Sequence, residues 1–282
     1  MEFSLIHVFD DPSDGLINNR LFNGSFLIVD QTKLTEKQKK EVFDLLVLLC
    51  MKMSSLWNIQ QCYLEKLEQV KLEVKNSEQR ENTAYFAAQS TDLMGWADVF
   101  LVQIKSTLDH LVKIPSPVFG YNRWSLASFG NRGEKVRRGF VSLPREYHKR
   151  TSNYYKSIFE DQEWIDDVIE LRDRLNHGVK GGGDPKMFSV SYNQETDTYR
   201  VPMWSDQQTM QDAMAVIFNN LLTTCCLFNG MIFAVKLPEH LTVVCDTKNT
   251  FGKEPLCKVV SMKDLENTIQ HTGKSSVRLP DE

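Results

Sequence analysis

The sequence predicts a mainly α-helical protein, built as a helical bundle with a long antiparallel helical hairpin and small β-hairpin additions. Apolar residues recur at spacings of three and four over two long stretches, a third stretch is apolar on nearly every side, and only short segments have the composition of strands. The 282 residues are 41% hydrophobic and 25% charged, which is ordinary for a globular chain and excludes collagen-like and wholly disordered proteins. We therefore expect one domain spanning residues 1–282.

The N-terminal 34 residues are predicted to form an arm with short strands at Phe3–Phe9 and Ser25–Asp30. The bundle then occupies residues 35–237. It opens with one helix from Thr35, which suits an N-cap, to Val74, about 60 Å long at 1.5 Å per residue. The apolar register of this helix is Val42, Leu46, Leu49, Met53, Leu56, Gln60, Tyr63, Leu67, Val70 and Val74.

A second helical register follows a polar break and completes the hairpin. Its positions are Phe86, Ser90, Leu93, Ala97, Phe100, Ile104, Thr107 and Leu111. Small residues in this stretch permit close approach to the first helix, so we expect the two helices to pack antiparallel between Thr35 and Ile114. Prolines end the hairpin, and the glycine-rich residues 115–143 are predicted to be an irregular basic insertion.

Shorter patterns complete the chain. The expected elements of the bundle are helices at Pro144–Glu160 and Gln162–Asn176, a β-hairpin at Phe188–Tyr192 and Thr198–Met203, and a long apolar helix at Met210–Val235. Residues 238–282 are predicted to be a partly flexible extension. It is expected to contain short strands at Thr242–Cys245 and Cys257–Val260 and to fray from Asn267.

The last bundle helix raises the question of a membrane. Ala213–Val235 has 23 residues and no charge, which is long enough to span a bilayer. It contains Asn219, Asn220 and Asn229, which favour a buried bundle helix over a lipid-facing one, so we expect no membrane. A membrane-associated helical protein is the alternative.

The cysteines and the N-terminal residues favour the cytoplasm. Six cysteines are too few to staple a chain of this length, and none forms a C-x-x-C pair, so we expect a reducing compartment. Residues 1–14 carry acids where a secretory signal carries basic residues, so no export or transit peptide is expected.

The net charge of the chain is −4, yet one segment is strongly basic. Between Tyr121 and Arg150, eight basic residues and two acids give a net charge of +6, so the rest of the chain carries −10. Basic side chains interleaved with aromatic rings suit phosphate contact and base stacking, so we predict RNA binding here. The candidate RNA-binding residues are Arg123, Trp124, Arg132, Lys135, Arg137 and Arg138. A solvated surface loop is the alternative.

A second candidate site lies at the end of the helix predicted at Gln162–Asn176, where residues 172–177 are Arg-Asp-Arg-Leu-Asn-His. On a helix Arg172 and His177 lie about 140° apart and about 7.5 Å apart along the axis, so the long arginine side chain is needed to bring them together. A histidine that exchanges a proton near neutral pH and an arginine that stabilises phosphoryl charge suit RNA cleavage without a metal. A symmetric dimer would supply two histidines, one as acid and one as base.

Helix capping alone is the alternative explanation of this motif. Arginine and histidine in a last turn interact favourably with the helix dipole. Asn176 is also cap-like, and Gly178 is the expected terminator.

The run Arg172-Asp173-x-x-x-His177, near a helix end in a helical chain, resembles the motif of the HEPN superfamily (higher eukaryotes and prokaryotes nucleotide-binding domains). The resemblance covers the motif and the bundle pattern from Thr35 to Leu237. It implies a metal-independent endoribonuclease that acts as a homodimer and leaves 2′,3′-cyclic phosphate ends. By this resemblance Arg172 and His177 are catalytic, Asp173 is the polar neighbour that orients the site, and Asn176 is a further candidate.

Members of this family often serve as toxins, in antiviral defence or in RNA processing, and many lack activity. We therefore expect RNA as a partner, and a regulatory protein or nucleotide as a further one. A non-catalytic helical dimer that binds RNA, nucleotide or a protein is the alternative. The toxin branch that pairs with a small nucleotidyltransferase has a tyrosine two positions after the histidine, where this chain has Val179, so that branch is not implied.

The other histidines predict no chemistry. His7, His148, His240 and His271 have no ligand spacing with cysteines or acids, so we expect neither a metal nor a cofactor. His110 is expected to be a surface residue or a core residue with its hydrogen bonds satisfied.

Overall fold

The structure is a computed structural model that describes residues 11–12, 15–77, 85–130, 134–144, 147, 163–177, 188–246 and 254–265. Helices hold 65% of these residues, so the mainly α-helical fold is confirmed. Contacts between Cα atoms divide the chain into two compact units. The first comprises Met1–Ser54, Ser106–Glu163 and Asn219–Glu282, and the second comprises Ser55–Lys105 and Trp164–Phe218.

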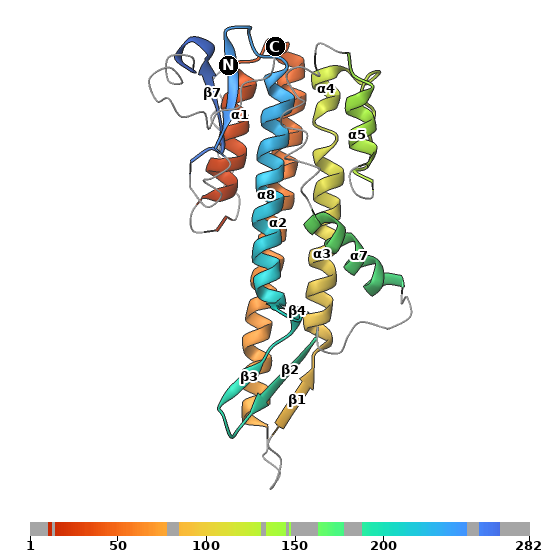
Figure 1. Ribbon diagram of the computed structural model, residues 1–282, viewed down its shortest axis with the longest axis vertical. Coiled ribbons are helices and arrows are strands. Elements are labelled where there is room, and N and C mark those ends of the chain that lie inside the picture. Colours follow the sequence, from red (N-terminus) through yellow and green to blue (C-terminus); the bar gives the residue numbers. More distant parts are fainter. Residues whose placement is uncertain are drawn as a thin grey trace. The chain divides into compact units, whose positions relative to one another are not determined.

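Three long helices contribute residues to both units (Figure 1): α2 (Glu36–Asn76), α3 (Thr91–Leu111) and α8 (Met210–Ala234). All ten positions of the register predicted for α2 are buried. Thr35 and Gln38 form a capping box at its start, because the Thr35 hydroxyl accepts from the Gln38 amide at 3.3 Å and the Gln38 side chain accepts from the Thr35 amide at 3.1 Å. The predicted long helix and its N-cap are therefore confirmed.

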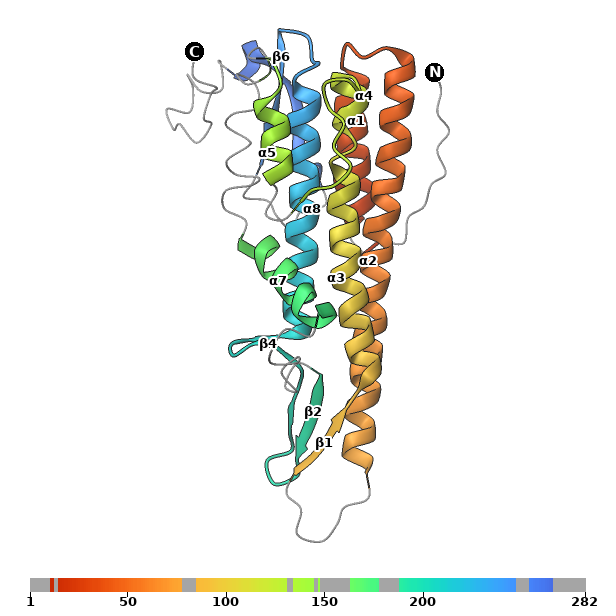
Figure 2. The ribbon, with the colours of Figure 1, turned by 90° about the vertical axis from the view of Figure 1, so that its right-hand side faces the viewer.

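The antiparallel hairpin of α2 and α3 is also confirmed (Figure 2). Three side-chain contacts join the helices: His110 Nε2 to the Leu45 carbonyl at 2.9 Å, Lys52 Nζ to Ser106 Oγ at 2.7 Å, and Lys66 Nζ to Asp92 Oδ2 at 3.0 Å. Residue numbers fall along α3 as they rise along α2, which defines the antiparallel arrangement.

The start of the second helix differs from the prediction. Tyr85–Gln89 forms strand β1, and α3 begins only at Thr91, where the Ser90 hydroxyl accepts from the Leu93 amide at 3.3 Å. β1 pairs antiparallel with β2, and Phe86 lies opposite Tyr192 in the register. Pairing with a distant strand therefore overrides the helical spacing of Phe86.

The second unit contains the predicted β-hairpin as strands β2 (Ser189–Asn193) and β3 (Thr198–Arg200), so the sheet has the order β1-β2-β3. The Asp197 carboxylate fastens this sheet to the end of α2, because it accepts from Tyr192 Oη at 2.7 Å and from Lys75 Nζ at 3.0 Å. These two hydrogen bonds hold the pKa of Asp197 below its usual value. A further two-stranded ribbon, β4 (Met203–Ser205) and β5 (Gln208–Thr209), leads directly into α8.

The first unit begins with the π-helix η1 (Leu16–Asn23) and with α1 (Gly24–Asp30). The strand predicted at Ser25–Asp30 is wrong. Ser25, Ile28 and Val29 are buried at the three- and four-residue spacing of a helix, and the Ser25 hydroxyl accepts from Asn229 Nδ2 of α8 at 3.1 Å. The strand predicted at Phe3–Phe9 lies outside the described residues.

The insertion at 115–143 is more ordered than predicted. It contains α4 (Pro115–Phe119) and α5 (Glu134–Val141). α5 is amphipathic: its Val136 and Phe140 are buried, as is Leu143 just after the helix, and Phe140 packs on Phe228 of α8 with ring centroids 6.1 Å apart. This buried face explains why residues 134–141 form a helix.

The predicted strands of the C-terminal extension form the ribbon β6 (Leu241–Cys245) and β7 (Cys257–Ser261). Cys245 and Cys257 are opposite each other in its register and are joined by a disulfide bond. The ribbon lies against α8, because a Cβ atom added to Gly230 would be 2.9 Å from Cys257 Sγ. A single crosslink therefore fastens this ribbon. The cysteine count did not indicate this disulfide.

Of the other predicted elements, some are confirmed and some lie outside the described residues. α7 (Glu163–His177) confirms the helix predicted at Gln162–Asn176, and α8 confirms the long apolar helix. Most of Pro144–Glu160 and the tail from Asn267 lie outside the described residues. The single domain stays a prediction.

Two helices of the described chain are long and apolar enough to cross a membrane, α2 and α8. In its most apolar window α8 is 78% buried within the protein, whereas α2 is 44% buried. The core helix of a soluble protein meets the same criteria, so the cytoplasmic location and the absence of a membrane stay predictions.

Candidate functional site

α7 carries the motif residues at its C-terminal end. Ile165, Val168, Ile169 and Leu171 are buried and give the helix one apolar face. Arg172 follows this face directly, and its side chain is 24% exposed. The helix therefore holds the backbone of Arg172 firmly and leaves part of its side chain in contact with solvent.

Arg172 and Asp173 are in direct contact. Arg172 donates from Nη2 to Asp173 Oδ1 at 2.6 Å and from Nε to the same oxygen at 3.2 Å. Such charge-assisted hydrogen bonds fix the plane of a guanidinium group. The contact is the one required if Asp173 orients Arg172; the catalytic roles of both residues stay predictions.

Asn176 and His177 are the last two residues of α7. Their backbone is helical, but their side chains lie outside the described part of the structure, as does Gly178. The approach of Arg172 to His177, and the capping alternative, therefore stay predictions.

The predicted RNA-binding residues lie in the first unit, and three of them surround one pocket. Arg123 lies in the turn after α4, and Lys135 and Arg138 lie on α5; all three are exposed. Arg132 lies outside the described residues, and the side chain of Arg137 is not described. The observed basic cluster therefore consists of Arg123, Lys135 and Arg138.

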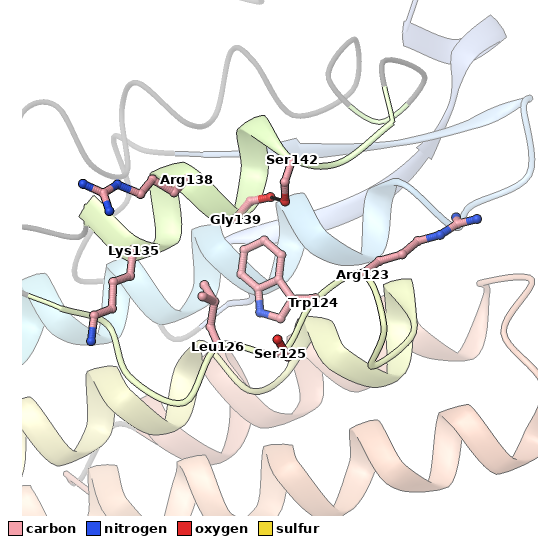
Figure 3. Close-up of a pocket in the computed structure, with 8 residues that line it drawn as sticks. All are labelled: Arg123, Trp124, Ser125, Leu126, Lys135, Arg138, Gly139 and Ser142. Carbon is pink, nitrogen blue, oxygen red and sulfur yellow. Dashed lines mark hydrogen bonds between the residues drawn. The ribbon is translucent and has the colours of Figure 1, made fainter.

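The pocket has a volume of about 270 Å³. Its apolar floor is formed by Trp124, Leu126 and Gly139 (Figure 3). The hydroxyls of Ser125 and Ser142 also line it, and the three cationic side chains extend outward around it. The pocket therefore has an apolar centre and a cationic rim.

Trp124 does not have the position expected of a base-stacking residue. Its side chain is 1% exposed, and its indole N–H donates to the Val112 carbonyl at 2.7 Å. Its ring packs against Phe140 with centroids 5.0 Å apart. The prediction that Trp124 stacks on RNA is therefore corrected: the residue supports the pocket from within the core.

Apart from Trp124, sequence reasoning missed the uncharged residues of the pocket, namely Ser125, Leu126, Gly139 and Ser142. A signal was present on α5. Lys135, Arg138, Gly139 and Ser142 recur at spacings of three and four, which places them on one face of a helix, but that helix was not predicted. The Cβ of an alanine at position 139 would lie 2.9 Å from the Trp124 ring, so glycine permits this face to approach the floor.

Three of the four free cysteines are buried. Burial raises the pKa of the thiols of Cys50, Cys225 and Cys226, that of Cys226 to about 12, so these cysteines are poor nucleophiles. Among the described residues, no group of three histidine, cysteine or acidic side chains is placed to hold a metal ion.

Two candidate sites thus stand on the geometry of the described residues. The second unit brings Arg172 and Asp173 into contact, and the first unit places Arg123, Lys135 and Arg138 around one pocket. Comparisons with protein-family models, with curated protein sequences and with solved protein structures found no match.

Proposed function

We propose that this chain is a metal-independent endoribonuclease of the HEPN type, acting as a homodimer, with Arg172, His177 and the supporting Asp173 and Asn176 at its site. The observation that carries the proposal is the Arg172 guanidinium held by Asp173 at 2.6 Å, five residues before His177 on the same helix. An oriented guanidinium on a partly exposed side chain is what stabilisation of a phosphoryl group requires.

The proposed reaction is an in-line transfer within RNA. The ribose 2′-oxygen attacks the adjacent phosphorus, a neutral His177 takes the 2′-hydroxyl proton, and the bond from phosphorus to the 5′-oxygen breaks. The protonated His177 of the second protomer gives its proton to the departing 5′-oxygen. Arg172 stabilises the negative charge on the phosphoryl oxygens, and the products carry a 2′,3′-cyclic phosphate and a 5′-hydroxyl.

The same proposal places the protein in the cytoplasm, with RNA as its substrate and a regulatory protein or nucleotide as a further partner. A role as a toxin or in antiviral defence follows from the HEPN resemblance alone. Neither role depends on the geometry of Arg172.

Rates of RNA cleavage by single variants test the assignment. We expect His177→Ala to lower the rate by about 10²–10⁴-fold, since it removes the acid–base group. Arg172→Ala should lower it by about 10²–10³-fold, since it removes a charge-stabilising donor. Glu163→Gln, at the exposed start of α7, is the matched control and should leave the rate unchanged. Folded variants that cleave as fast as the parent would show that α7 does not carry the reaction.

A non-catalytic function is the second candidate, and the basic pocket beside α5 favours it. A helical dimer could hold RNA, a nucleotide or a protein partner through its surface without cleaving anything. RNA retained at low salt but left intact by the parent protein would support this function over the nuclease.

A further inference from the structure

The pocket beside α5 carries positive charge that no described acid balances. Arg123, Lys135 and Arg138 form no ion pair with any acidic side chain in the described part of the chain. Lys135 donates to the Ser128 hydroxyl at 2.9 Å, but that partner is neutral. Three cations around one depression create a local field that attracts anions. The pocket therefore favours a ligand with a concentrated negative charge.

The size and floor of the pocket exclude a bare anion as the best ligand. Its volume of about 270 Å³ is close to the lower end of small-molecule sites, which span about 300–1,000 Å³. Trp124, Leu126 and Gly139 give it an apolar floor that an inorganic anion would leave uncovered. A ligand that fits must join an anionic group to a less polar body.

The cations are divided between two sides of the pocket. Figure 3 shows Lys135 and Arg138 on the α5 side and Arg123 on the opposite side, with the Trp124 ring between them. Lys135 and Arg138 are three residues apart on α5 and thus share a helix face, where one phosphate can contact both. The planar Arg123 guanidinium suits stacking on a base.

We propose that this pocket binds a nucleotide with a terminal phosphate, either a free nucleoside monophosphate or the 5′ end of an RNA strand. The phosphate lies against Lys135 and Arg138, and the base lies toward Arg123. A phosphomonoester carries a charge of about −1.5 to −2 near pH 7, which matches the three cations better than the single charge of a phosphodiester. Among the described residues no acid or histidine lines the pocket, so it binds without cleaving. The free-nucleotide form of this ligand deepens the non-catalytic function proposed above, and the RNA form also rests on the proposed nuclease.

Calorimetric titration of the full chain tests the proposal, with His177→Ala as the parent so that RNA cleavage does not intervene. AMP should bind, whereas adenosine and inorganic phosphate should each bind at least about tenfold more weakly. Arg138→Gln should weaken AMP binding about tenfold. Ser125→Glu, which places a carboxylate at an exposed pocket position, should abolish it. Arg200→Gln on β3 removes an equal charge elsewhere and should change nothing.

Single-stranded RNA with and without a 5′-phosphate distinguishes the two sources. Tighter binding of the phosphorylated strand than of AMP supports an RNA end, and tighter binding of AMP supports a free nucleotide. The proposal would be overturned if Arg138→Gln bound AMP with the same affinity as the parent, or if the parent bound AMP and inorganic phosphate with equal affinity. If the unmodified protein cleaves RNA but AMP does not bind, the proposal of a pocket ligand is wrong and the nuclease proposal stands. If AMP binds but the unmodified protein cleaves no RNA, the nuclease proposal is wrong and the pocket ligand stands.

Discussion

At the scale of single residues, the packing of α8 against the β6–β7 ribbon depends on the missing side chain of Gly230. A Cβ atom there would lie 2.9 Å from Cys257 Sγ, which is closer than van der Waals contact allows. We expect Gly230→Ala to lower the free energy of unfolding by about 1–3 kcal/mol, because the ribbon or the helix must shift. Chemical denaturation measures this change.

Gly95 on α3 provides the control for this prediction. An added Cβ atom meets nothing within 4 Å at this exposed position. Gly95→Ala should therefore raise the free energy of unfolding by about 0.5–1 kcal/mol, since alanine restricts the unfolded chain and favours helix. Equal destabilisation by both substitutions would contradict the packing described at Gly230.

His110 makes the stability of the first unit sensitive to pH. The residue is 6% exposed, and Nε2 donates to the Leu45 carbonyl at 2.9 Å, so Nε2 carries a proton. Desolvation lowers the pKa of His110 below its usual value, and the charges of Lys113 and Lys52 act in the same direction. The unfolded chain then binds a proton more readily than the folded chain, so stability should fall as the pH falls below about 6.5.

Unfolding free energies measured between pH 7.5 and pH 5 check this expectation. His110→Gln keeps a donor near the Leu45 carbonyl but does not titrate, so its curve should be flatter than that of the parent in this window. His240→Gln, at an exposed position, should leave the slope as it is. Parallel curves for parent and His110→Gln would show that the histidine does not contribute.

At the scale of secondary-structure elements, the Cys245–Cys257 disulfide fastens the β6–β7 ribbon. It joins residues 12 positions apart, and closing a loop of that length restricts the unfolded chain. We expect reduction by dithiothreitol to lower the free energy of unfolding by about 3 kcal/mol. The buried thiols of Cys50, Cys225 and Cys226 should not take part in thiol–disulfide exchange in the folded protein, because burial raises their pKa.

The double variant Cys245→Ala/Cys257→Ala is the control, and dithiothreitol should not change its stability. A parent protein that is insensitive to the reductant would contradict the crosslink. In the disulfide-bonded structure Cys257 Sγ lies 3.6 Å from the Cys226 carbonyl but carries no hydrogen to donate. In a reducing compartment the pair would be two thiols, and the Cys257 S–H could then donate to this carbonyl of α8.

Elements whose signal is local were predictable from the sequence. α2 and α8 follow the period of a helix over their full length, and the strands β2 and β3 flank a polar turn. β1 was not predictable, because Phe86 fits a helical register and becomes a strand residue only by pairing with Tyr192. α1 is short enough that its apolar run suits a strand or a helix equally.

The candidate sites were predictable in composition but not in geometry. The contact of Arg172 with Asp173 involves sequence neighbours, so the motif itself indicated it. The charge of the basic segment was also evident in the sequence. The burial of Trp124 was not, because it depends on the Val112 carbonyl and on Phe140 of a helix that was not predicted. Long-range packing thus decided which aromatic residues remain open to a ligand.

At the scale of the whole molecule, the two candidate sites belong to different units. The Arg172 motif lies in the second unit, and the pocket with Lys135 and Arg138 lies in the first. The two sites have no residue in common, so variants at one site can be made without replacing any residue of the other. Cleavage and nucleotide binding can therefore be measured separately in the same chain.

The most direct test of the central proposal is the chemistry of the RNA ends that the protein produces in EDTA. Purified protein would be incubated with labelled single-stranded and structured RNA, beside His177→Ala. We predict cleavage that persists in EDTA, leaves 2′,3′-cyclic phosphate ends, and is lost in the variant. Cleavage that requires a divalent metal, or products with 3′-hydroxyl ends, would contradict the assignment of Arg172 and His177.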